Sequence, residues 1–249
     1  MKRTTIILLL SFVTLLATAQ SSPPKRILFV GNSYTYFWNL PQQVNAMAEA
    51  KDVPLKAYQS TAGGVNLGQH WRGEKNLNSR EIIQEKEFNA IIIQDHSMRS
   101  IEAPDSLMFF GKRMAKLITA RGAQPYLYMT WSRIWDPYMQ APIQAAYESL
   151  GEATGAIVVP VGLAWEKARQ LRPELPLYDA DGSHPSSLGS YLTACVFFST
   201  LSGESPIGLP HRLITTDKDG EKLYLNIQSE EDALFCQKVA ADIIKTYSN

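Results

Sequence analysis

The feature that most limits the possible folds is a run of three isoleucines, Ile91 to Ile93, which follows Ala90 and ends at Gln94. Successive β-branched residues favour a strand, and in a strand successive side chains point to opposite faces. A strand that is apolar on both faces is typical of a parallel sheet covered by helices on each side. The sequence therefore predicts an α/β protein built around a buried strand at this point.

Strand-like and helix-like segments alternate on both sides of this run. Short apolar stretches that suit buried strands occupy residues 26–30, 55–60, 125–131 and 156–161, and segments of helical character occupy residues 40–51, 104–121, 141–154, 163–171, 186–201 and 230–246. This alternation predicts a five-stranded parallel sheet with helices on both faces. Residues 212–227 depart from it, because two extended runs there flank Asp219-Gly220, which predicts a β-hairpin appended to the sheet.

The first 19 residues are expected to be a secretory signal peptide. The basic pair Lys2-Arg3 precedes an apolar run, Ile6–Leu16, and Ala17-Thr18-Ala19 supplies the small residues that signal peptidase requires. An uncleaved anchor is the alternative, but the apolar run is shorter than the roughly 20 residues that span a bilayer. We therefore expect residues 20–249 to form one exported domain, periplasmic or extracellular, without stable membrane insertion.

The composition excludes several classes of function. Basic and acidic side chains balance at 24 each, and no basic cluster with interleaved aromatic residues indicates nucleic-acid binding. The histidines are scattered and none has a metal-ligand spacing to a cysteine, so we expect no metal and no other cofactor. Cys195 and Cys236 lie in separate apolar segments. A disulfide is one interpretation for an exported protein, and two buried free thiols are the preferred one.

Polar residues that follow the predicted strands carry the chemistry, because in an open parallel sheet the active site lies beyond the carboxyl ends of the strands. Ser33 follows the first strand directly; on its own it is more simply interpreted as a helix-capping serine. Asp181 and His184 lie three residues apart on one loop. A serine becomes a nucleophile when a histidine takes its proton and an acid orients that histidine. We therefore predict a catalytic triad of Ser33, His184 and Asp181.

A glycine pair, Gly63-Gly64, follows the second predicted strand. Acyl transfer requires N–H donors aimed at the oxyanion that develops on the substrate carbonyl. A glycine lets the backbone approach a substrate closely, although an ordinary turn would use the same residue. Gly64 is therefore a candidate donor in an oxyanion hole.

Together these segments resemble the SGNH hydrolase superfamily, also called the GDSL esterase/lipase family. That family has a Gly-Asp-Ser-like block after the first strand, a glycine after the second, an Asn-bearing block after the third and Asp-x-x-His near the C-terminus. The resemblance spans residues 26–246. It implies a flavodoxin-like three-layer sandwich and an oxyanion hole formed by the N–H groups of Ser33 and Gly64 with one side-chain amide.

Two departures from the family pattern affect the expected site. Asn32 stands where the family has an aspartate, and Gln94-Asp95-His96-Ser97 replaces the usual Gly-x-Asn-Asp block. Gln94 carries the same amide as the missing asparagine on a stem longer by one methylene, so it is our candidate for the third oxyanion donor. The alternative is that Gln94 only braces its loop.

The resemblance implies a serine esterase, and the expected export favours removal of acyl groups, most plausibly acetyl groups, from a carbohydrate. Tyr34, Trp131 and Arg133 lie near the predicted active site and are candidates for substrate binding, although each is equally suited to the core or a lid. The alternative is a catalytically weak or inactive carbohydrate-binding protein on the same fold. The complete set of Ser33, Asp181 and His184 argues against that alternative.

Overall fold

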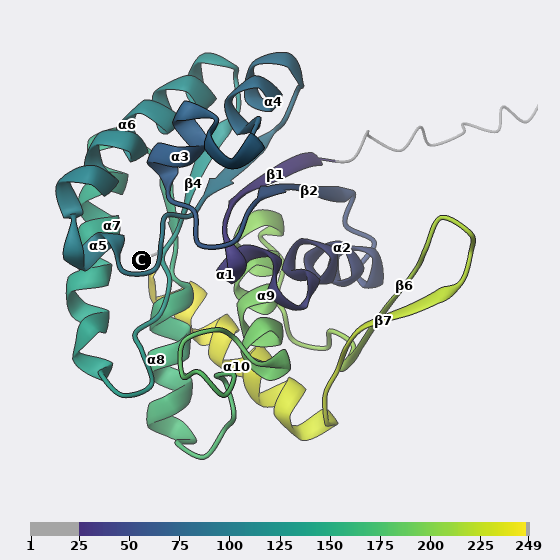
Figure 1. Ribbon diagram of the computed structural model, residues 1–249. Coiled ribbons are helices and arrows are strands. Elements are labelled where there is room, and N and C mark those ends of the chain that lie inside the picture. The colour runs from purple at the N-terminus through teal and green to yellow at the C-terminus, as the bar shows by residue number, and fades with distance from the viewer. Residues whose placement is uncertain (1–24, 248–249) are drawn as a thin grey trace, which may run out of the picture.

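The computed structural model describes residues 25–247, so the predicted signal peptide and the start of the predicted domain lie outside the described residues. Five strands form one parallel sheet in the order β2-β1-β3-β4-β5. Figure 1 shows β1 and β2 side by side in this sheet. Their bounds are Lys25–Gly31 for β1, Leu55–Thr61 for β2, Ala90–Ile93 for β3, Gln124–Tyr128 for β4 and Ile157–Val159 for β5. The predicted α/β fold with a five-stranded parallel sheet is therefore confirmed.

Helices cover both faces of this sheet, because the central strands have apolar side chains on both faces. One face is covered by a layer that consists of α2 (Leu40–Ala50), α8 (Val161–Leu171), α9 (Ser187–Ser202) and α10 (Glu230–Tyr247). The other face packs against α3 (Leu67–Arg72), α4 (Ser79–Glu85), α6 (Pro104–Ala120) and α7 (Gln140–Thr154). The alternation of side chains along β3 explains why Ile92 lies in the first layer while Ile91 and Ile93 lie in the second.

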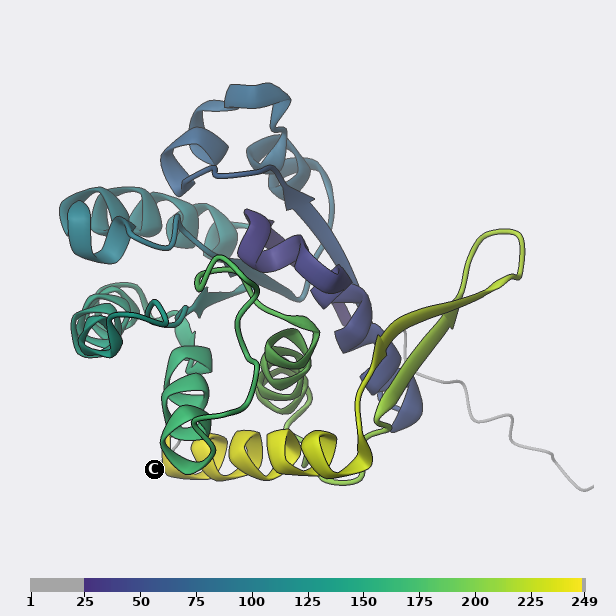
Figure 2. The ribbon, with the colours of Figure 1, turned by 60° about the horizontal axis from the view of Figure 1, so that its bottom comes forward.

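The α9 helix is buried along nearly its whole length, which explains its apolar sequence. It lies between the sheet and α10, and α10 packs across both α9 and α8 (Figure 2). Cys195 on α9 and Cys236 on α10 are both buried and both free, as the free-thiol interpretation predicts. Burial raises the pKa of each thiol, which keeps both sulfurs protonated and unreactive at neutral pH.

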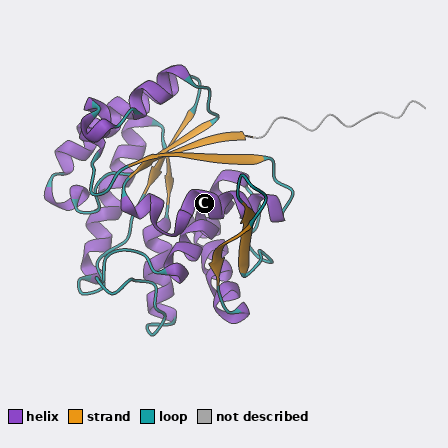
Figure 3. Cartoon of the chain, turned by 45° about the vertical axis from the view of Figure 1, so that its right-hand side comes forward, coloured by secondary structure: helices purple, strands orange, loops and turns teal. Residues whose placement is uncertain are grey.

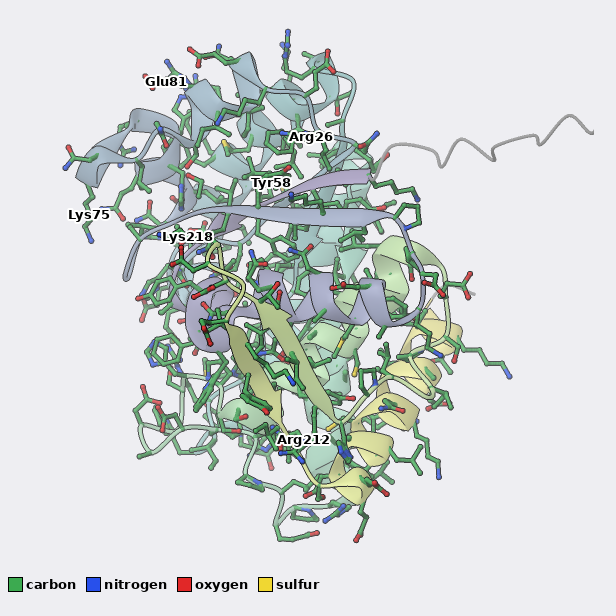
Figure 4. The ribbon with its side chains drawn as sticks, turned by 90° about the vertical axis from the view of Figure 1, so that its right-hand side faces the viewer. Arg26, Tyr58, Lys75, Glu81, Arg212 and Lys218 are labelled. Atoms are coloured by element: carbon green, nitrogen blue, oxygen red, sulfur yellow. The ribbon has the colours of Figure 1, made fainter. Side chains whose placement is uncertain are left out.

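The predicted hairpin is confirmed as a unit separate from the main sheet (Figure 3). Its strands, β6 (Arg212–Thr216) and β7 (Lys222–Ile227), pair in the antiparallel sense. Gly220 lies in the turn with a φ of 86°, which a residue with a Cβ rarely adopts. Arg212 and Lys218 mark opposite ends of the hairpin in Figure 4.

Several boundaries differ from the sequence-based expectation. The fourth strand ends at Tyr128 and not at Trp131, because β5 offers only three residues for pairing and the chain then turns across the carboxyl edge of the sheet. The short helices α1 (Ser33–Tyr36), α3, α4 and α5 (Arg99–Glu102) were not predicted. Each has at most seven residues, too few for a helical periodicity to be recognised. Within residues 25–247, no helix is long and apolar enough to cross a membrane.

Candidate active site

Ser33 lies at the carboxyl end of β1, as the first residue of α1 (Figure 1). Asn32 caps this helix, since its side-chain oxygen accepts a hydrogen bond from the Tyr34 N–H at 3.1 Å. The residue before Asn32, Gly31, has to be a glycine. A Cβ on Gly31 would lie 2.3 Å from Thr35 Oγ1 and 2.5 Å from Gln94 Oε1. The turn therefore presents the Ser33 hydroxyl at the sheet edge by packing the backbone closely behind it.

The structure brings Ser33, His184 and Asp181 together. His184 Nε2 lies 2.9 Å from Ser33 Oγ, and His184 Nδ1 lies 2.5 Å from Asp181 Oδ2. The other oxygen of Asp181 accepts the backbone N–H groups of Ser183 and His184, each at 2.9 Å. The three-residue spacing of the loop thus lets a single carboxylate fix both the imidazole and the backbone that carries it.

The Asp181 carboxyl group is ionised over the whole physiological pH range. Burial alone would raise its pKa, but hydrogen bonds from the His184 ring and from the N–H groups of Ser183 and His184 outweigh that effect and lower the pKa to about 2. An ionised carboxylate accepts the Nδ1–H of the imidazole, which leaves Nε2 free to accept the serine proton.

Aromatic side chains from the nucleophile segment hold the imidazole in place. Phe37 stacks on the His184 ring with centroids 4.5 Å apart, and Tyr34 meets its edge at 5.5 Å. Tyr34 also hydrogen bonds to Ser183 Oγ at 2.7 Å. The segment that follows Ser33 therefore also orients the histidine loop, a role that the sequence does not reveal for Phe37.

A cavity of about 380 Å³ opens above these side chains. It is lined by Asn32, Ser33, Tyr34, Tyr36, Phe37, Gly63, Gly64, His96, Ser97, Arg133, Ser183 and His184. Within residues 25–247, the backbone N–H groups of Ser33 and Gly64 donate to no other residue. Gly64 has a φ of 64°, and no atom lies within 4 Å of where its Cβ would be. Both predicted backbone donors therefore line the cavity.

The predicted role of Gln94 as an oxyanion donor does not fit its position. The side chain is fully buried and does not line the cavity. Its carbonyl oxygen accepts from the Asn32 N–H at 2.9 Å and from the Thr35 hydroxyl at 3.0 Å, while its NH₂ group donates to the Asp95 carbonyl. The side-chain amide of Gln94 fills the space that the missing Cβ of Gly31 leaves. This position agrees with the alternative interpretation, in which Gln94 braces a loop and does not contact the substrate.

Asn32 makes donor contacts that an aspartate could not make at this position, because a carboxylate has no N–H group. Its NH₂ group donates to the carbonyl oxygen of Val65 at 2.9 Å and of Asp95 at 3.5 Å. Asp95 Oδ1 in turn accepts from the Leu67 N–H at 2.9 Å and from the His96 N–H at 2.7 Å. These bonds tie together the segments that follow β1, β2 and β3, which fixes the walls of the cavity relative to Ser33.

His96 lines the cavity from the segment after β3 and was not predicted as a site residue. Burial lowers the pKa of His96, and the nearby charges of Arg99 and Arg133 lower it further, so the ring is neutral. Its Nδ1 accepts the Met98 N–H at 3.4 Å, which leaves the ring proton on Nε2 as a donor. The signal in the sequence is its position two residues beyond Gln94, in the block where the family carries its asparagine.

The three candidate substrate-binding residues differ in their access to the cavity. Tyr34 lines it although the side chain is mostly buried, and Arg133 lines it from the loop after β4. Trp131 does not line it, because its ring is buried between Trp165, at a centroid distance of 3.8 Å, and Tyr34, at 4.6 Å. The indole N–H donates to the Ser183 carbonyl at 3.0 Å. Trp131 therefore packs against the loop that carries His184, and its ring is not accessible to a substrate.

Several solved structures are similar to this chain. A protein from Slackia heliotrinireducens that is assigned to the SGNH hydrolases has 23% identity and a TM-score of 0.61, over 72% of this chain and 99% of its own. A DUF4886 family protein from Bacteroides uniformis has 16% identity and a TM-score of 0.73, over 91% and 96%. The psychrotrophic esterase EstA from Pseudoalteromonas, in a structure inhibited by monoethylphosphonate, has 12% identity and a TM-score of 0.55, over 72% and 97%.

No protein-family model and no curated protein matches the sequence. The structural similarities show that the chain has the fold of the SGNH hydrolases. The fold implied by the sequence resemblance is thereby confirmed.

Proposed function

We propose that this protein is a serine esterase that hydrolyses acyl esters through an acyl-enzyme intermediate. The observation that carries the proposal is the continuous hydrogen-bonded arrangement from Ser33 Oγ through His184 to Asp181, with distances of 2.9 and 2.5 Å. This arrangement opens into a cavity that Ser33 and Gly64 also line, and their N–H groups have no acceptor among the described residues. Nucleophile, base, orienting acid and oxyanion donors thus share one site.

The reaction follows from this geometry. His184 Nε2 takes the proton of Ser33 as the serine oxygen attacks the ester carbonyl, and Asp181 stabilises the imidazolium that forms. The negative charge that develops on the carbonyl oxygen is stabilised by the N–H groups of Ser33 and Gly64. His184 then gives its proton to the leaving alcohol, and a water molecule activated by the same histidine hydrolyses the acyl-serine.

We assign the third oxyanion donor to His96 in place of Gln94. The Nε2–H of His96 has no partner within residues 25–247, and the side chain lines the same cavity as Ser33 and Gly64. Because burial and neighbouring charges lower the pKa of the ring, it donates as a neutral imidazole and does not compete with His184 for the serine proton.

The size of the cavity favours a short acyl group. About 380 Å³ lies at the lower end of the range for ligand pockets, which begins near 300 Å³. Acetyl is the acyl group that we propose. Because we expect the protein to be exported, the proposed substrate is a carbohydrate ester outside the cytoplasm. A larger cavity of about 750 Å³ lies beside β5, between α7, α9 and α10, but no histidine lines it, so it lacks the serine–histidine pair that the proposed mechanism uses.

Hydrolysis of p-nitrophenyl esters tests the proposal. The wild-type protein should hydrolyse the acetyl ester with a higher kcat/KM than the octanoyl ester, and Ser33→Ala should abolish the activity while the circular dichroism spectrum is unchanged. Ser106→Ala, on α6 and outside the residues that line the cavity, serves as the matched control. A folded wild-type protein that hydrolyses none of these esters would favour the alternative of a binding protein on the same fold.

A further inference from the structure

Arg133 is a cation without an anionic partner at the mouth of the candidate active site. It lies on the loop after β4, and its side chain is half-buried. One Nη donates to the Tyr34 hydroxyl and the other donates to Ser97 Oγ at 2.8 Å, so both acceptors are neutral. Within residues 25–247, no carboxylate forms a salt bridge with Arg133. Among the described residues, its charge therefore has no anionic partner.

The guanidinium also keeps free hydrogen-bonding capacity. It has five N–H donors, of which the contacts to Tyr34 and Ser97 use two. The other donors have no acceptor within residues 25–247. Leaving a charged group partly desolvated without a partner is costly. An anion that met the free donors of Arg133 would offset this cost.

The contacts of Arg133 hold its charged group beside the catalytic side chains. Its Cζ lies 5.7 Å from the centroid of the Tyr34 ring, and that ring lies 5.5 Å from the ring of His184. Tyr34 directly follows Ser33 in the sequence. An anion bound by Arg133 would therefore lie close enough to Ser33 to be part of the ester that Ser33 attacks.

Arg133 is the only lysine or arginine among the residues that line the cavity, and none of these residues is acidic. A single guanidinium matches a singly charged, planar carboxylate, with which it forms two parallel hydrogen bonds. A phosphate group carries more charge and usually meets more than one cation. The charge and the geometry of the site thus favour a carboxylate.

We propose that Arg133 forms a carboxylate-binding subsite, so that the substrate is an acyl ester that also carries a carboxylate near the ester group. This inference rests on the proposed esterase function and specifies its substrate class. Within the proposed carbohydrate substrates, it selects acylated acidic sugars over neutral ones.

A matched pair of esters tests the subsite. 4-Acetoxybenzoate carries a carboxylate, and its methyl ester lacks the charge but has the same acetyl group. The wild-type protein should have a kcat/KM at least about tenfold higher for the anion, since a charge-assisted bidentate contact at a half-buried site is stronger than a contact with a neutral group. Arg133→Gln should remove this preference, Arg133→Lys should keep part of it, and the exposed Arg113→Gln on α6 should keep it fully.

Two outcomes would overturn the proposal. One is a wild-type protein that prefers the neutral ester. The other is an Arg133→Gln variant that loses activity equally toward both esters, because Arg133 would then only brace Tyr34 and Ser97. Binding of the same two compounds to Ser33→Ala by calorimetry separates this inference from the esterase proposal. Tighter binding of the anion without any turnover by the wild type would count against the esterase alone, and equal binding would reject the subsite.

Discussion

The two segments that flank Ser33 in the cavity are built in opposite ways. The loop from Asp181 to His184 is a short local unit in which both oxygens of one carboxylate are bonded within the same loop. The segment from Gln94 to Ser97 depends on contacts with β1 and with the turn after β2. The first segment therefore shows its Asp-x-x-His spacing in the sequence itself, whereas the arrangement of the second is apparent only in the folded chain.

The largest loss of activity is expected from substitutions in the loop from Asp181 to His184. His184→Ala removes the base, and Asp181→Asn removes the charge that orients it; each should lower kcat by about 10⁴-fold, because the members of a triad act as a unit. Steady-state kinetics with p-nitrophenyl acetate measure the loss. A reduction below tenfold in either folded variant would show that the loop does not carry the chemistry.

Acid should destabilise the protein through a histidine behind the nucleophile turn. His70 is fully buried between Ser79 Oγ, at 2.6 Å, and the Gly31 carbonyl, at 3.0 Å. Burial lowers its pKa from 6.5 to about 4. The unfolded chain therefore binds more protons between those values, and the free energy of unfolding should fall by up to about 3 kcal/mol as the pH drops from 6.5 to 4.

Urea unfolding at several pH values checks this expectation, with His70→Asn as the control. The variant lacks the titrating ring, so its unfolding free energy should change less over the same pH window. Parallel pH profiles for the two proteins would contradict the assignment and would leave the burial of His70 without an energetic consequence.

Substitutions of His96 test whether the segment after β3 supplies an oxyanion donor. Loss of one oxyanion donor typically costs roughly a hundredfold or more in kcat. His96→Ala should show a loss of this size with little change in KM, and His96→Asn should recover part of it, since an amide restores an N–H donor. If His96→Ala keeps the wild-type kcat, the oxyanion hole has only the two backbone donors.

Gln94 should affect stability more than catalysis. Gln94→Leu leaves the Asn32 N–H and the Thr35 hydroxyl without their buried acceptor, which should cost about 1–3 kcal/mol of unfolding free energy. Thermal denaturation measures this loss, and kinetics at 20 °C should show a smaller decrease in kcat than for His96→Ala. A larger kcat effect than that of His96→Ala would return the donor role to Gln94.

The sequence predicts the parts of the molecule that depend on local patterns. The isoleucines of β3 reveal a buried parallel strand, and the Asp-x-x-His spacing reveals a loop that the structure places beside Ser33. The orientation of Gln94 could not be predicted, because it depends on the space that Gly31 leaves on the neighbouring strand. Trp131 was misassigned for a related reason, since the early end of β4 turns its ring into the core.

Covalent labelling of Ser33 tests the central claim most directly. A fluorophosphonate should add once to the wild-type protein, and peptide mass spectrometry should place the adduct on Ser33, because only a serine activated by a base attacks the phosphorus rapidly. Ser33→Ala should remain unlabelled, and His184→Ala should be labelled at a rate lower by orders of magnitude. Labelling at another residue, or none on folded wild-type protein, would contradict the account.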